Sequence, residues 1–97
     1  MNVGFHPAAR AEFRAAVDRC NLQREGLGHE FAAEVKRAVR RIVGYPEAWT
    51  PLSARSRRCL LRRFPFGIVY QVRGETILIV AVMHLHRHPD SWKSRLA

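Results

Sequence analysis

Arginines gather in one short stretch of this sequence. Arg55, Arg57, Arg58, Arg62 and Arg63 lie close together with no acidic residue among them. Arginine is always ionised and makes planar, two-pronged contacts with phosphate and carboxylate groups. The stretch therefore predicts a binding surface for a nucleic acid or an acidic protein segment. The alternative is a solvated edge strand that binds nothing.

Histidines gather in a second stretch. His84, His86 and His88 alternate around Arg87, so they would share one face of an extended segment. Such spacing suits zinc, but Asp90 is the one nearby carboxylate, so we expect a polar surface with no metal and no cofactor. The remaining alternative is that His84 or His86 acts as an acid or base beside Arg87, because histidine titrates near neutral pH.

Other reactive or aromatic side chains have simpler explanations in packing. Tyr70 alternates with apolar residues, and Cys20 lies on the apolar side of a predicted helix. Cys59 has arginine neighbours that would lower its pKa, but no Cys-His-Asn pattern accompanies it. Trp49 and Trp92 either stack on a base or cover the rim of the core.

Length and charge limit the class of protein. With 97 residues, of which 47% are apolar, the chain predicts a single folded domain over 1–97. The formal charge is +9, from 17 Lys and Arg against 8 Asp and Glu. Residues 51–97 hold nine of these cations but two of the acids. This half is therefore expected to meet an acidic partner.

The sequence also indicates a compartment. The N-terminal residues carry charge early and lack the apolar run of an export signal, and two cysteines form no disulfide framework. The longest uncharged apolar stretch, 76–85, is about half the length that spans a bilayer. We therefore expect a cytoplasmic protein with no membrane partner.

A helix hairpin is predicted over 7–44. Pro7 is favoured at a first helical position, and two successive segments repeat their apolar residues at the same helical offsets. A glycine-rich break at 26–28 separates them, and Gly44 is suited to end the second. Pro89 is placed to start a last helical turn.

Strands account for the remainder. A short extended segment at 3–5 precedes the helices, and 45–56 is predicted as a loop. The apolar period then changes to two, which predicts strands at 57–64, 66–73 and 76–85. The first of these suits an edge, and the last, almost wholly apolar, suits the centre. The order β-α-α-β-β-β predicts an α+β fold in which the helix hairpin packs on a mostly antiparallel sheet.

Three segments together carry a resemblance to a known family: Val3–Ala9 with Glu12, Arg62–Val72, and Ile77–Arg87 followed by Pro89 and Trp92. In their order and spacing they resemble the RelE/ParE superfamily of type II toxin–antitoxin toxins, and most closely its ParE-like, plasmid-stabilisation branch. The resemblance covers nearly the whole chain. It implies a bacterial toxin that inhibits growth and is neutralised by an acidic, ParD-like antitoxin encoded beside it.

The superfamily implies two target chemistries. RelE-like members cut mRNA on the ribosome, whereas ParE-like members poison DNA gyrase. Nuclease members carry an arginine where this chain has Gly67, and lysines where it has arginines and leucines over 58–62. Arg87 matches a second nuclease arginine, but Trp92 or Lys93 stands at the place of a tail tyrosine. The sequence therefore favours the gyrase-directed, non-enzymatic toxin.

Two alternatives stay open. A ribosome-dependent, metal-independent endoribonuclease would use Arg62, Arg63, His84 and Arg87. A generic nucleic-acid-binding module would read phosphate charge alone. For the toxin, the acids of the antitoxin are expected to meet the arginine stretch, namely Arg55, Arg57, Arg58, Arg62 and Arg63, while its apolar anchors enter a groove beside the helix hairpin. Contacts with the target are expected from His84, His86, Arg87 and Trp92.

Overall fold

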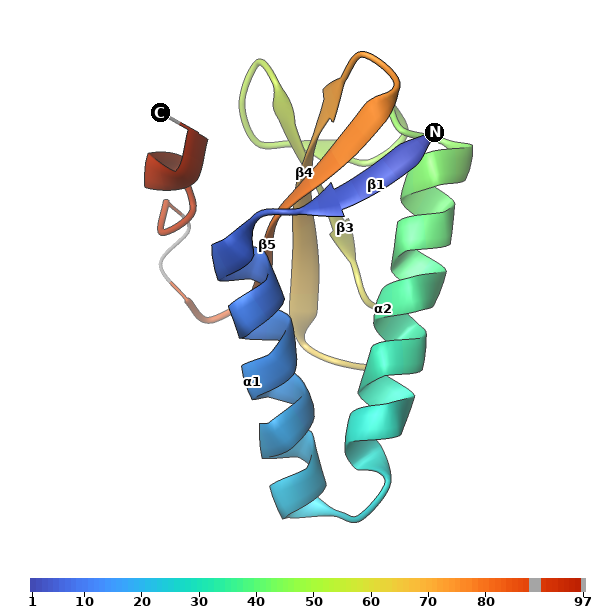
Figure 1. Cartoon of the computed structure of the whole chain (residues 1–97), viewed down its shortest axis with the longest axis vertical. Coiled ribbons are helices and arrows are strands. Elements are labelled where there is room, and N and C mark those ends of the chain that lie inside the picture. The colour runs from blue at the N-terminus through green and yellow to red at the C-terminus, as the bar shows by residue number, and fades with distance from the viewer. Residues whose placement is uncertain (88–89, 97) are drawn as a thin grey trace.

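The fold is a helix hairpin laid on one face of a five-stranded sheet (Figure 1). A computed structural model describes residues 1–87 and 90–96. The helices are α1 (Pro7–Gln23) and α2 (Leu27–Gly44). The strands are β1 (Asn2–Phe5), β2 (Thr50–Pro51), β3 (Ser56–Leu60), β4 (Phe66–Arg73) and β5 (Thr76–His84), and a short 3-10 helix, η1 (Lys93–Leu96), follows. Across the sheet the order is β1-β5-β4-β3-β2, and only the β1–β5 pair is parallel. The predicted α+β architecture is confirmed.

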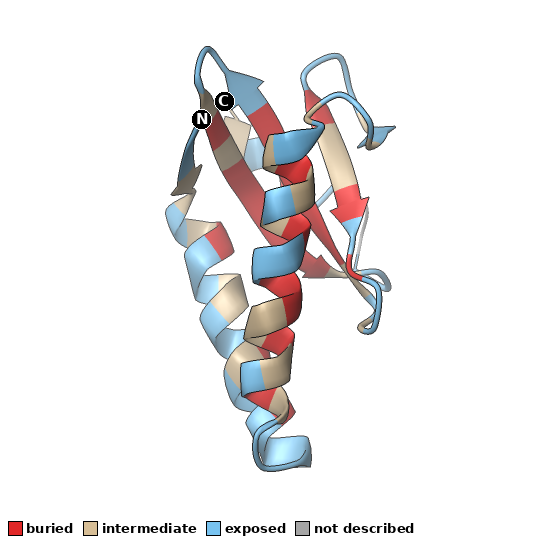
Figure 2. Ribbon diagram, turned by 90° about the vertical axis from the view of Figure 1, so that its right-hand side faces the viewer, coloured by how far each residue is buried: buried red, intermediate tan, exposed pale blue. Residues whose placement is uncertain are grey.

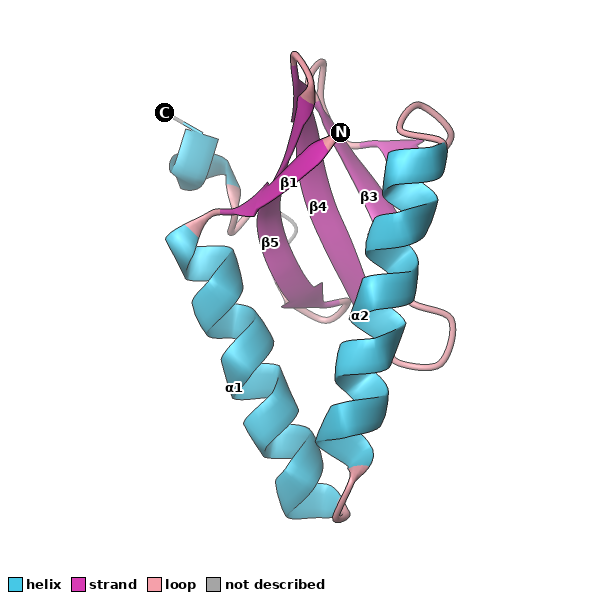
Figure 3. Cartoon of the chain, turned by 45° about the vertical axis from the view of Figure 1, so that its right-hand side comes forward, coloured by secondary structure: helices cyan, strands magenta, loops and turns pink. Residues whose placement is uncertain are grey.

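Side chains fix the starts of both helices. His6 precedes α1, and its Nδ1 accepts a hydrogen bond from the N–H of Ala8 at 3.0 Å. The Oδ1 of Asn21 on α1 accepts the N–H of Gly28 on α2 at 2.8 Å. A Cβ at Gly28 would lie 2.6 Å from the carbonyl oxygen of Val17, so only glycine permits this approach. From this close contact the helices diverge as a V (Figure 3).

The main core lies between the helices and the sheet. Buried positions run along the side of α2 that faces the strands (Figure 2). Phe31 is fully buried there, and its ring lies 4.9 Å from that of Phe66 and 5.2 Å from that of Phe64. Each such side chain contributes about 2–3 kcal/mol by leaving water. This cluster fixes the hairpin on the sheet.

A second, smaller core covers the other face of the sheet. Trp92 is 2% exposed there and packs with Val80 and Ala81. A shift in the β4–β5 register leaves Val80 without an opposite partner, so two consecutive residues of β5 lie on this face. Both faces of β5 are covered, as its almost wholly apolar sequence predicted, but β4 and not β5 is the central strand, because β5 lies between β1 and β4.

Two predicted boundaries are wrong. The strand expected over 57–64 ends at Leu60, because the backbone N–H of Arg63 donates to the Oε1 of Glu34 on α2 at 3.1 Å and leaves the ladder. The segment 45–56, predicted as a loop, contains β2. Since β2 pairs with β3, the arginine-bearing strand is not the outermost one.

The C-terminal segment is described in part. The helical turn predicted to start at Pro89 falls at residues 88–89, which lie outside the described residues. The described segment forms η1 after Trp92. Within 1–87 and 90–96, no helix combines the length and the apolar character needed to cross a bilayer.

Candidate functional site

The five arginines of the predicted surface do not form one strip. Arg57 and Arg58 are neighbours on β3, so their side chains point to opposite faces of the sheet. Arg55 precedes β3, whereas Arg62 and Arg63 follow it. The set is therefore divided between two ends of the sheet. We call these the hairpin end, where β4 turns into β5, and the opposite end, where β4 begins and β5 ends.

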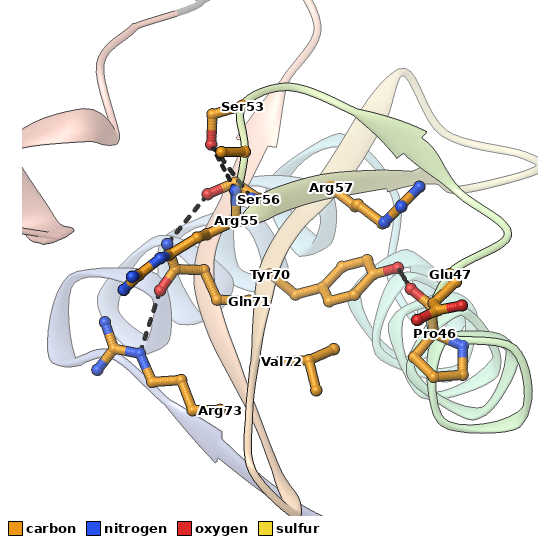
Figure 4. Close-up of a pocket in the computed structure, with 11 residues that line it drawn as sticks. Pro46, Glu47, Ser53, Arg55, Ser56, Arg57, Tyr70, Gln71, Val72 and Arg73 are labelled. Atoms are coloured by element: carbon orange, nitrogen blue, oxygen red, sulfur yellow. Dashed lines mark hydrogen bonds between the residues drawn. The ribbon is translucent and has the colours of Figure 1, made fainter.

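A pocket of about 470 Å³ lies at the hairpin end. We call it the arginine pocket, and the residues that matter here are Glu47, Arg55, Arg57, Gln71, Val72 and Arg73. Figure 4 shows Arg55 and Arg73 on one side, Arg57 and Glu47 on the other, and Val72 between them. Three guanidinium groups from three segments thus surround one hollow that holds a single carboxylate.

Neutral partners orient two of these guanidinium groups, those of Arg57 and Arg73. The Nε of Arg73 donates to the Oε1 of Gln71 at 3.1 Å, and Gln71 donates in turn to the hydroxyl of Ser56 at 3.2 Å. The Nη1 of Arg57 donates to the carbonyl oxygen of Trp49 at 2.8 Å. Since amide, hydroxyl and carbonyl partners carry no net charge, they leave the charges of Arg57 and Arg73 unneutralised, and Glu47 is the one carboxylate among the lining residues.

The opposite end has a different electrostatic arrangement. Arg63 lies 2.7 Å from the Oε1 of Glu30, which also binds Arg24 at 2.7 Å. Hydrogen bonds from Arg63 and Arg24 lower the pKa of Glu30. A hydrogen bond from Arg37 likewise lowers the pKa of Glu34, against the effect of burial. Arg63 is therefore a link between α2 and the sheet.

Arg87 is also paired within the chain. Its Nη1 lies 2.6 Å from the Oε2 of Glu12 on α1, and Arg95 lies 2.7 Å from the Oε1 of the same carboxylate. Glu12 further accepts the N–H of Val82 at 3.1 Å, and Arg95 donates to the carbonyl oxygen of Val80 at 2.9 Å. Beyond the end of β1, the side chains of Glu12 and Arg95 thus form hydrogen bonds with backbone groups of β5. Hydrogen bonding to Glu12 raises the pKa of Arg95.

The histidines meet at the end of β5. The rings of His84 and His86 lie 4.8 Å apart, and the backbone N–H of His86 donates to the Nδ1 of His84 at 3.1 Å. The ring of His84 also lies 5.2 Å from that of Phe66. His88 lies outside the described residues. In the part of the chain that the structure describes, no three His, Cys, Asp or Glu side chains form a metal-binding group.

The predicted target-binding residues are only partly brought together. His84 and Arg87 line a pocket of about 240 Å³ between α1 and the sheet, together with Glu12 and Arg19. Trp92, in contrast, is buried against the other face, as its packing alternative predicted. Its ring is therefore not exposed to a target.

The predicted packing roles of Tyr70 and Cys20 are confirmed, because both are buried, and Cys59 is buried as well. The hydroxyl of Tyr70 donates to the carbonyl oxygen of Pro46, and burial raises the pKa of Tyr70 to about 12. Burial also raises the pKa of Cys20 and of Cys59, where nearby Arg41 opposes the effect. Thiols held in this way are poor nucleophiles.

The side chain of Arg58 on β3 explains why position 67 is a glycine. A Cβ at Gly67 would lie 2.8 Å from the Cδ and 3.0 Å from the Cγ of Arg58. The stem of Arg58 therefore crosses the place where nuclease members carry their own arginine. Its Nε is buried and has no hydrogen-bond partner among the described residues.

An apolar groove lies between β1 and the two helices, where the sequence predicted one beside the hairpin. It has a volume of about 450 Å³. We call it the apolar groove, and its main lining residues are Val3, Phe5, Phe13, Val35, Lys36 and Arg40. The two cations are exposed at its rim. The groove therefore combines apolar walls with positive charge.

Sequence reasoning missed three residues of these sites. Arg73 carried a usable signal, since it stands beside the Gly74 turn and two residues from Gln71. Glu12 lay in a segment that carried the resemblance, but nothing indicated its partners. Arg95 gave no signal, because its contact with α1 depends on how the C-terminal segment folds back.

Comparison with known proteins agrees with this geometry. The solved structure "Chromosomal ParDE TA system from P. aeruginosa" matches 87% of this chain and 95% of that chain, with a TM-score of 0.64 and 18% identity. That likeness shows a shared toxin fold. No curated protein sequence matches significantly. Residues 3–89 match the family "ParE toxin of type II toxin-antitoxin system, parDE", and the chain belongs to this family.

Proposed function

We propose that this chain is the toxin of a type II toxin–antitoxin pair, that it arrests growth in the bacterial cytoplasm by poisoning DNA gyrase, and that a cognate acidic antitoxin neutralises it. Membership of the ParE toxin family over residues 3–89 is the observation that carries the proposal. His84, His86 and Arg87 are the proposed target contacts. Trp92 is no longer among them, because it is buried.

The surroundings of the nuclease positions support a non-enzymatic toxin. RNA cleavage without a metal needs cations free to meet the phosphate that reacts. Arg87 is held by Glu12 at 2.6 Å, and Arg63 is held by Glu30 at 2.7 Å. Two of the arginines named for the nuclease alternative, Arg63 and Arg87, are thus engaged inside the fold.

Induction of the chain in bacteria, with two readouts, tests the target. We expect growth arrest with induction of the SOS response and trapped double-strand breaks, while transcripts stay intact. Rapid, codon-linked cleavage of mRNA would overturn the gyrase assignment. Absence of any growth effect, together with steeply salt-dependent binding to any DNA, would favour the generic nucleic-acid-binding module.

One observation favours the endoribonuclease as a second candidate. Arg58 crosses Gly67 from the neighbouring strand, so an arginine side chain does occupy the nuclease position. If mRNA cleavage is seen on induction, Arg58→Gln should abolish it, whereas Arg14→Gln on the exposed side of α1 should not. Under the gyrase assignment, neither variant has a cleavage activity to lose.

The antitoxin is expected to use both apolar and acidic contacts. Its apolar side chains fit the apolar groove, and its carboxylates fit the arginine stretch, Arg55, Arg57, Arg58, Arg62 and Arg63. Arg63 contributes less than the others, because Glu30 already binds it. A segment of this kind is disordered when free and orders on the toxin.

A further inference from the structure

The arginine pocket lies across the end of β3, where β4 continues past it. The β3–β4 ladder ends at the pair Ser56–Gln71, and β4 runs on to Arg73. Side chains alternate along a strand, so Gln71 and Arg73 share the face of Val69, which belongs to the second core, opposite the helices. Figure 4 shows Arg55 on this same side of the pocket. Arg55 and Arg73 therefore form one side of the pocket, on the face of the sheet that the helix hairpin does not cover.

Buried neutral side chains hold the guanidinium group of Arg73 in place. Ser56 is fully buried and Gln71 is 6% exposed. Gln71 donates from its Nε2 to the hydroxyl of Ser56 at 3.2 Å, and its Oε1 accepts the Nε of Arg73 at 3.1 Å. This contact uses only the Nε of Arg73, so within residues 1–87 and 90–96 its two Nη nitrogens have no partner. The group is thus oriented before a ligand binds, and its outer edge is free for a two-pronged contact with an anion.

No carboxylate of the described residues pairs with either arginine on this side of the pocket. The side chain of Arg55 is exposed and has no hydrogen-bond or ion-pair partner among those residues. Glu47 lies with Arg57 on the other side (Figure 4). Glu75, in the turn that follows β4, lines a different hollow beside β1. Two guanidinium groups therefore face one hollow with their charge available to an external anion.

The lining of this side suits a phosphate of a nucleic acid better than a carboxylate of a peptide. A peptide gains its affinity chiefly from large apolar and aromatic anchors, whereas Ser53, Ser56 and Gln71 line this side together with the two arginines. Arginine, serine and glutamine side chains are among those that hold backbone phosphates in complexes with nucleic acids. The net charge of +9 further raises the local concentration of a polyanion around the chain.

We propose that Arg55 and Arg73 form a site for the backbone phosphates of a DNA duplex, and that Gln71 is a positioning residue for Arg73. The site binds phosphate charge and carries no sequence preference, because backbone phosphates are the same in every sequence. The choice of DNA rests on the proposed function, since DNA gyrase acts on a duplex that the toxin would contact beside the enzyme. Because Arg55 also belongs to the arginine stretch assigned to the antitoxin, antitoxin and duplex exclude each other at this residue.

Fluorescence anisotropy with a labelled DNA duplex of arbitrary sequence tests the site at several salt concentrations. We expect Arg55→Gln and Arg73→Gln each to weaken binding about tenfold at low salt, and to make the slope of log K against log salt shallower by about one. Arg73→Lys should weaken binding as well, since lysine keeps the charge but not the two-pronged contact. The matched control Arg14→Gln removes the same charge from the exposed side of α1 and should stay within about twofold.

A double-mutant comparison tests the positioning role of Gln71. Gln71→Met removes the acceptor of Arg73 without changing the net charge. It should weaken duplex binding in the wild-type background and have no further effect in an Arg73→Gln background. A loss of equal size in both backgrounds would mean that Gln71 acts on the fold and not through Arg73. Thermal unfolding of every variant serves as the folding control.

Three outcomes would overturn the site. Equal losses for Arg73→Gln and Arg14→Gln, with Arg73→Lys unchanged, would show that only net charge matters. Displacement of the duplex by millimolar inorganic phosphate at matched ionic strength would make the ligand a free phosphate. Pocket variants that lose affinity for poly-glutamate but not for the duplex would make it an acidic protein. In each case, growth arrest with SOS induction by the wild type leaves the proposed function standing, whereas its absence refutes that function whatever the duplex measurements give.

Discussion

The arginines at the two ends of the sheet differ in what surrounds them. At the opposite end, Arg63 and Arg87 contact carboxylates of α2 and α1, and Arg95 joins the same arrangement from the C-terminal segment. At the hairpin end, Arg55 and Arg73 line a pocket, and the guanidinium group of Arg73 donates to the neutral side chain of Gln71. Residue type is the same at both ends, but of these five arginines only the three at the opposite end form ion pairs within the described residues.

This difference separates structural cations from binding cations. A buried or half-buried ion pair is costly to break once formed, because the remaining charge is left without a partner. An arginine without a carboxylate keeps its capacity for an external anion. The hairpin end therefore holds three arginines, Arg55, Arg57 and Arg73, that keep this capacity, although Glu47 lines the same pocket.

The largest effect is expected from substitution of Glu12, whose carboxylate binds both Arg87 and Arg95. Glu12→Ala leaves Arg95, 15% exposed, and the N–H of Val82 without their acceptor, so we expect a loss of about 2–4 kcal/mol in the free energy of unfolding. Urea denaturation measures it. Asp18→Ala, on an exposed position of the same helix, should change stability by less than about 0.5 kcal/mol. A loss at Glu12 no larger than this control would mean that the cluster is not structural.

A second variant tests the contact between Gly67 and Arg58. Gly67→Ala should destabilise the fold by about 1–2 kcal/mol, because its Cβ would press on the stem of Arg58. In an Arg58→Ala background the same substitution should cost little or stabilise, since alanine is favoured over glycine within a strand. Urea denaturation of the four proteins gives the coupling. Equal costs in both backgrounds would contradict the contact.

Lowering the pH should destabilise the fold through Glu34, at the opposite end of the sheet. The pKa of Glu34 is lowered in the fold, so its contribution to stability is complete above its ordinary pKa of about 4.3 and is lost as the pH falls through the lowered value. Glu34→Gln should therefore show a shallower loss of stability between about pH 5 and pH 2 than the wild type. The exposed Glu75→Gln serves as control, and its acid profile should follow the wild type. Identical profiles for all three proteins would argue against the Glu34 contacts.

The smallest effect on stability is expected for two exposed arginines, Arg63, which has a carboxylate partner, and Arg55, which has none among the described residues. The side chain of Arg63 is 55% exposed, so solvent screens its ion pair with Glu30 and Arg63→Gln should lower the melting temperature only slightly. Arg55→Gln should leave it unchanged, because Arg55 has no carboxylate partner among the described residues. Differential scanning calorimetry compares the two melting temperatures. A larger fall in melting temperature for Arg55→Gln than for Arg63→Gln would mean that Arg55, and not Arg63, makes the stabilising contact.

The sequence predicted the fold better than the sites, and particular residues explain why. Apolar periodicity located α1, α2, β4 and β5, because burial of one face is a local pattern. It failed after Leu60, because the strand ends where Glu34, distant in sequence, takes the N–H of Arg63. For the same reason an arginine-rich stretch looked continuous: the carboxylates that bind Arg63 come from α2, and no local pattern reports them.

The side chains of Glu12 and Arg95 have one more consequence for the sheet. Strand β1 is four residues long, and beyond it the N–H of Val82 and the carbonyl of Val80 on β5 are held by these two side chains. A long strand with free backbone groups templates pairing with another chain, which is the route to domain swapping and amyloid. The Glu12–Arg95 pair occupies the two backbone groups through which another chain could pair with this part of β5.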